Sequence, residues 1–91
     1  MHTIRVSLAG PSRGAAQDRV LALVSDLIWA HAAPLLGLEH LRAKASDDGV
    51  DVYLFLRADS EAAALAQAHA LVERARISLT SHGYRTDLTR R

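Results

Sequence analysis

Apolar and polar residues alternate along three short segments of the chain. In residues 3–8 the three aliphatic side chains share one side of an extended backbone, and polar side chains occupy the other. The same alternation recurs in residues 38–46 and 50–57. A period of two is typical of half-buried β-strands. The Asp-Asp-Gly sequence at 47–49 predicts a hairpin between the strands at 38–46 and 50–57, because Asp and Gly tolerate the positive φ angles of tight turns.

Two longer segments have the three–four spacing of amphipathic helices. The first is predicted over residues 15–33, and Pro34 ends it because proline donates no backbone hydrogen bond. Its core-facing stripe, flanked by Leu23 and Ile28, is predicted to hold Ala16, Val20, Val24, Leu27 and His31.

The second helix follows Asp59 or Ser60, either of which can cap it. Gly83 is placed just beyond its end, where a left-handed backbone costs glycine little. A short last strand is predicted over residues 84–88. The buried face of this helix is predicted to consist of Leu65, Ala68, Val72, Ala75 and Leu79.

The predicted order is strand, helix, strand, strand, helix, strand. Two amphipathic helices can bury their stripes only against one face of the sheet that these strands form. With right-handed crossovers, this predicts an α+β fold: a ferredoxin-like βαββαβ sandwich with the first and third strands central. We expect residues 1–91 to form a single ferredoxin-like domain.

Composition narrows the function classes. The chain is 49% hydrophobic and 23% charged with a net charge of +1, which is ordinary globular usage and gives no basic tail for bulk nucleic-acid binding. No cysteine is present, so thiol catalysis and disulfides are excluded. Seventeen alanines, ten arginines against one lysine, and no asparagine are typical of GC-rich bacterial genomes. No signal peptide is visible at the N-terminus, so we expect a cytoplasmic protein.

The sequence contains few candidates for a catalytic, metal-binding or anion-binding site. No Gly-x-Ser-x-Gly nucleophile elbow occurs, and the one adjacent pair of acids lies in the predicted hairpin turn, so we expect no catalytic residues. No two of the five histidines are three or four residues apart, so we expect no metal and no cofactor. A low-ranked anion site is predicted at the glycine-bearing loop before the first helix, with Ser12, Arg13 and Gly14.

The strand pattern also predicts a distinctive surface. If the aliphatic residues face the helices, the opposite face of the sheet presents Arg5, His40, Arg42, Lys44, Tyr53 and Phe55. Tyr53 and Phe55 should lie on a central strand, where leaving them in water forfeits about 1.5–3 kcal/mol of burial each. The helical wheel turns Trp29 away from the core, so it is either partly covered by the Pro34–Leu38 turn or a second candidate contact for a partner.

Two kinds of partner fit this face. The preferred hypothesis is a non-catalytic interaction or accessory module that associates sheet to sheet, either as a homodimer or with another protein. The alternative is a regulatory domain that binds RNA, a small molecule or an anion through the sheet face or the Gly10–Gly14 loop. Residues 51–57 lack the Lys/Arg-Gly-Phe-Gly-Phe sequence of RNA-recognition domains, and Asp51 would repel phosphate, so nucleic acid is the less favoured partner. No membrane association is expected.

Overall fold

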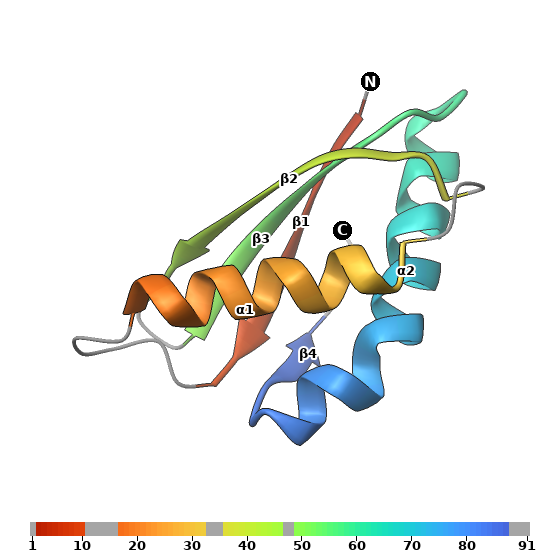
Figure 1. Ribbon diagram of the computed structural model, residues 1–91. Helices are drawn as coiled ribbons and strands as arrows, with labels where there is room; N and C mark the ends of the chain where they lie inside the picture. Colours follow the sequence, from red (N-terminus) through yellow and green to blue (C-terminus); the bar gives the residue numbers. More distant parts are fainter. Residues whose placement is uncertain (1, 11–16, 33–35, 47–48, 88–91) are drawn as a thin grey trace.

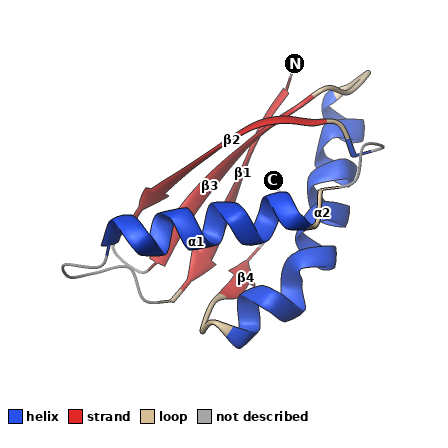
Figure 2. Cartoon of the chain, viewed as in Figure 1, coloured by secondary structure: helices blue, strands red, loops and turns tan. Residues whose placement is uncertain are grey.

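The computed structural model describes residues 2–10, 17–32, 36–46 and 49–87, and these form three long strands, two helices and one short strand (Figures 1 and 2). The α+β prediction is confirmed. The elements follow in the order β1 (His2–Ala9), α1 (Gln17–Ala30), β2 (Leu38–Ala45), β3 (Gly49–Leu56), α2 (Glu61–Ser81) and β4 (Arg85–Asp87).

The sheet is antiparallel, with strands in the order β2-β3-β1-β4. β3 pairs along its whole length with β1, from Gly49 opposite Ala9 to Leu56 opposite His2. On its other side β3 pairs with β2, whose register shifts between Leu38 and His40. Within the described residues, β4 pairs with β1 from Arg85 opposite Ala9 to Asp87 opposite Ser7. The sheet therefore consists of three long strands and one short edge strand.

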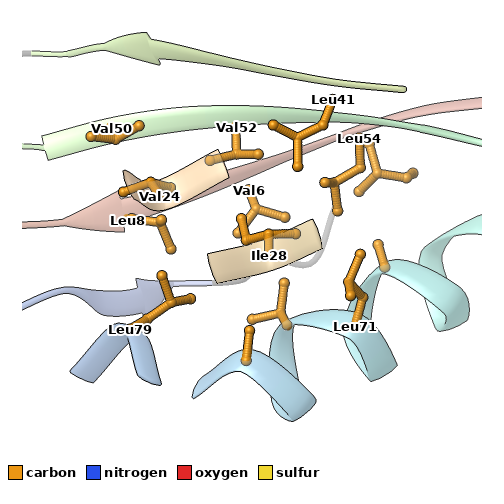
Figure 3. Close-up of a cluster of buried hydrophobic side chains, with 14 of the residues drawn as sticks. Val6, Leu8, Val24, Ile28, Leu41, Val50, Val52, Leu54, Leu71 and Leu79 are labelled. Atoms are coloured by element: carbon orange, nitrogen blue, oxygen red, sulfur yellow. The ribbon is translucent and has the colours of Figure 1, made fainter. Parts of the chain in front are cut away.

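The core lies between one face of this sheet and the two helices. In Figure 3 the sheet residues Val6 and Leu54 point toward Ile28 of α1 and Leu71 of α2. Every aliphatic residue at the alternating positions of β1 and β3 is buried, as the period of two predicted. On β2 only Leu41 is fully buried, because the two inward-facing residues that follow it are alanines near the edge.

α1 buries less of its predicted stripe than expected. Val24 and Ile28 are buried, whereas Val20, Leu27 and His31 lie only partly covered at the margins of the core. The helix ends at Ala30, and the amides of His31 and Ala32 then bond to carbonyls three residues back. These three-residue bonds tighten the final turn. Ala16, also predicted in this stripe, lies outside the described residues.

The caps of α2 confirm two predictions and its buried face corrects a third. The Ser60 hydroxyl accepts the amide N–H of Ala63 at 3.1 Å, and Gly83 has φ of 91° just past the helix end. Leu65 was predicted in the core but is 37% exposed. Leu65 instead lines a groove between β1 and the first turns of α2. The buried face of α2 holds Ala64, Ala68, Leu71, Val72, Ala75 and Leu79.

Two glycines, Gly10 and Gly37, allow close contacts to backbone near the ends of the strands. A Cβ on Gly10 would lie 2.6 Å from Cδ1 of the buried Tyr84 ring, so this ring packs directly on backbone. Gly37 has φ of 70°, and its carbonyl accepts the amide N–H of Arg57 at 2.9 Å. Beside it, the Gln67 side chain of α2 donates to the carbonyl of Leu36 at 2.5 Å and to that of Arg57 at 3.0 Å.

Candidate interaction face

The helices leave the second face of the sheet open in the part of the chain that the structure describes. We call this surface the outer face and define it by three residues from each long strand: Thr3, Arg5, Ser7, His40, Arg42, Lys44, Asp51, Tyr53 and Phe55. The register places them in three cross-strand rows, with β3 always in the middle. The six residues that the sequence predicted here are thus brought together on one surface.

The first row is Thr3–Phe55–His40, and it carries an aromatic pair. The rings of His40 and Phe55 have centroids 5.3 Å apart with planes tilted by 45°. The Phe55 side chain is half-buried by its strand neighbours, whereas Thr3 and His40 are exposed. A flat apolar ring therefore lies at the centre of this row with one side available.

The second row is Arg5–Tyr53–Arg42. Both arginines are exposed, and Tyr53 between them is half-buried. Side chains directly opposite on neighbouring strands have Cβ atoms about 4.5–5.5 Å apart, so both guanidinium groups can reach the surface above the Tyr53 ring. This row combines an aromatic platform with two positive charges.

The third row, Ser7–Asp51–Lys44, holds the one carboxylate of the outer face. The Ser7 hydroxyl donates to Oδ1 of Asp51 at 3.1 Å, and Lys44 lies on the opposite side of the same residue. The acid is therefore confined to one end of the face and already has two polar neighbours. The other two rows contain no acid.

Among the described residues, Arg5, Arg42 and Lys44 form no ion pair. Glu39, the nearest acid on β2, instead pairs with Arg57 at 2.9 Å. Glu39 is the extra residue at the point where the β2–β3 register shifts. Such a bulge interrupts the regular alternation of side chains between the two faces of a strand. On the three long strands, Asp51 is therefore the carboxylate placed among these positive charges.

The sequence missed one further cation. Arg85 of β4 is exposed and lies opposite Ala9, at a position with the same parity as Arg5 and Ser7. By the same register Asp87 lies opposite Ser7, so β4 extends the outer face with one cation and one acid. The alternation of the predicted strand over residues 84–88 assigns Arg85 to one side of that strand, but only the pairing with β1 shows that this side belongs to the outer face.

An open groove of about 730 Å³ continues from the outer face around the edge of β1. Its lining combines one side of β1 with the first turns of α2: Thr3, Ile4, Arg5, Ser7, Glu61, Ala62 and Leu65. This groove accounts for the exposure of Leu65. The carboxylate of Glu61 at its α2 wall makes it less suited to anions than the first two rows.

The remaining candidate positions lie elsewhere. Trp29 is 42% exposed as predicted, but it belongs to α1 on the opposite side of the sheet and is not brought together with Tyr53 and Phe55. The predicted anion loop with Ser12, Arg13 and Gly14 lies outside the described residues, as do Asp47 and Asp48 of the hairpin.

The histidines have separate environments. His31 shares a hydrogen bond of 3.2 Å with the Ser78 hydroxyl, and Nδ1 of His82 contacts the Ser78 carbonyl at 2.9 Å. Within the described residues, no group of three or more His, Cys, Asp or Glu side chains could hold a metal ion. No helix in this part of the chain is long and apolar enough to cross a bilayer.

Comparisons with protein-family models, curated proteins and solved structures found no match for this chain. The structure by itself thus defines the class: a small α+β protein whose antiparallel sheet is covered by helices on one face. Its other face carries two aromatic residues on a central strand, flanked by cations.

Proposed function

We propose that this protein is a non-catalytic interaction module that associates with a partner macromolecule through the outer face of its sheet. The observation that carries the proposal is the position of Tyr53 and Phe55 in the middle of a strand with neighbours on both sides, on a face that no described element covers. An apolar platform with a polar rim is the usual composition of a binding surface.

The rings of Tyr53 and Phe55 lie outside the hydrophobic core. Stability comes from the opposite face, where Val52, Leu54 and Leu56 are completely buried. Phe55 and Tyr53 alternate with these residues and add nothing to that core, yet each still exposes part of its ring. Covering the remaining apolar area would contribute about 25 cal/mol per Å² to association.

A second copy of the chain is the occupant that the sequence favoured. Packing two outer faces together would bring Arg5, Arg42 and Lys44 of each copy close to those of the other. On the three long strands, Asp51 is the acid of each copy that could compensate, because Glu39 is engaged by Arg57. On β4, Asp87 lies opposite Ser7. Like charges placed opposite one another weaken association, so the charge pattern supports a partner of opposite charge over self-association.

The proposal includes the full ferredoxin-like βαββαβ topology. It is supported by the element order and by β1 and β3 lying between β2 and β4. In that topology both crossover helices cover the same face, which is what leaves the outer face open along its length.

The test compares the wild type with Phe55→Asp and with the control Ile77→Asp. Ile77 is 77% exposed on α2, so the control places the same charge on a surface remote from the outer face. Light scattering measures self-association, and tagged protein captures partners from the source cells, with protein and nucleic acid both analysed. Loss of dimer or of a captured partner in Phe55→Asp alone supports the proposal. Equal behaviour of Phe55→Asp and wild type would show that the outer face is not the binding surface.

A further inference from the structure

We infer that the partner of the outer face is a single-stranded nucleic acid, whose bases stack on Tyr53 and Phe55 and whose phosphates contact Arg5, Arg42 and Lys44. This inference rests on the proposed function and names its partner. The chemistry that carries it is the combination, within neighbouring rows, of a flat ring with flanking guanidinium groups. A nucleotide supplies the complement to both in one repeating unit: a base with a π-face and a phosphate.

The aromatic spacing fits successive bases. Tyr53 and Phe55 are two residues apart on one strand, so their side chains emerge on the same face about 7 Å from each other. Stacking needs an unpaired base, because duplex base faces are hidden within the helix. The outer face presents its two rings side by side on an extended strand, an arrangement suited to stacking with unpaired bases. The geometry therefore points to a single strand lying across the sheet.

The cations are placed to follow a phosphate backbone. Arg5 on β1 and Arg42 on β2 flank Tyr53 from both sides, and Lys44 follows two residues after Arg42 along β2. All three side chains are exposed, and none forms an ion pair within the described part of the chain. Arginine suits this task because its planar guanidinium group matches phosphate geometry.

Asp51 limits the part of the outer face that a nucleic acid can contact. Its carboxylate lies in the third row and would repel a phosphate that passed over it. The nucleic acid is therefore expected to cross the Phe55 and Tyr53 rows and to leave the outer face over β2, on the Lys44 side of the third row, without passing over Asp51. An acidic protein would meet the cations equally well, but its carboxylates would not cover the two rings.

The experiment measures binding of fluorescein-labelled oligo(U) and oligo(dT) twelve-mers and of a mixed-sequence duplex by anisotropy at several salt concentrations. With three phosphate contacts, the slope of log K against log salt is expected to be about −2 for the single strands. Tyr53→Ala should weaken their binding about 5- to 150-fold. Arg42→Ala should make the slope shallower by about 0.7, and Asp51→Asn should strengthen binding.

Matched controls separate stacking and specific contacts from bulk charge. Trp29→Ala removes an exposed aromatic residue and Arg76→Ala an exposed cation, both from helices on the opposite side of the sheet. Neither should change the affinity. Equal binding of the duplex, or equal losses in the controls and the outer-face variants, would overturn the inference.

Failure of this inference is distinguishable from failure of the proposed function. No oligonucleotide binding, together with a protein lost from capture by Phe55→Asp, would overturn the nucleic-acid partner and leave the outer face as a protein-binding surface. No oligonucleotide binding and no effect of Phe55→Asp on self-association or capture would overturn both.

Discussion

Two neighbouring residues on β3 allow a direct test of which face of the sheet stabilises the fold. Leu54 is fully buried beneath the helices, and Phe55, the next residue, lies half-buried on the outer face. Because both are on the same strand, alanine substitutions share the same backbone context. The structure predicts that Leu54→Ala is far more destabilising than Phe55→Ala.

The expected cost at Leu54 follows from its surroundings. Its side chain has no solvent exposure and contributes to the core between sheet and helices (Figure 3). Truncation removes the transfer free energy of three carbon atoms and leaves a cavity that the close-packed core refills only in part. Such substitutions lower the free energy of unfolding by about 2–5 kcal/mol. That is a large share of the roughly 5–14 kcal/mol typical for a chain of this size.

The expected cost at Phe55 is smaller because water replaces the lost ring and no cavity forms. What is lost is the contact with the His40 ring at 5.3 Å and the higher strand preference of an aromatic residue. Cross-strand pairs and strand propensity are each worth up to about 1 kcal/mol. We therefore expect Phe55→Ala to lower the free energy of unfolding by about 1 kcal/mol.

Urea denaturation followed by far-ultraviolet circular dichroism measures both values, and each variant is studied at two protein concentrations about a hundredfold apart. Equal m-values and a difference of about 2 kcal/mol or more between the variants are expected. A Phe55→Ala cost as large as that of Leu54→Ala would contradict the reasoning. If the wild-type midpoint rose with concentration and that of Phe55→Ala did not, self-association through the outer face would be indicated.

Two further predictions concern the backbone and a buried hydroxyl. A Cβ on Gly49 would overlap the carbonyl oxygen of Leu8 and lie 2.9 Å from the amide nitrogen of Gly10, so Gly49→Ala should cost about 3 kcal/mol or more by urea denaturation. The reciprocal control Ala9→Gly should cost about 1 kcal/mol, and comparable effects would argue against the close approach. Burial raises the pKa of the Tyr84 hydroxyl above its ordinary 10.0, so the unfolded chain ionises first and stability falls as the pH rises above 10. Tyr84→Phe should make the thermal midpoint less sensitive to pH between about 9 and 11, and an unchanged slope would contradict this linkage.

The candidate face was largely predictable from the alternation within each strand. Period-two patterning assigns Tyr53 and Phe55 to one side and Leu54 to the other whatever the strand pairs with. The pattern does not say which side chains are neighbours across strands. The register supplied the Arg5–Tyr53–Arg42 row, and with it the charge pattern that changed the favoured partner from a second copy to a polyanion.

Local chemistry likewise determined several element ends. Ser60 caps α2 because its hydroxyl can reach an amide three residues on, and Gly83 ends it because glycine adopts positive φ at low cost. These features depend on residues within one turn, so the sequence contains all the information needed to place them.

Other features depend on segments far apart in the chain, and only the tertiary structure decided them. The helical spacing of Leu65 is that of a core residue, yet Leu65 lines the groove between β1 and the first turns of α2 and remains 37% exposed. Tyr84 is buried because Gly10, distant in sequence, lets its ring lie against backbone. Glu39 neutralises Arg57 and not the outer face because the register shifts at that position. A periodic pattern reports which side of an element a residue occupies, whereas burial and charge pairing are set by what packs against that side.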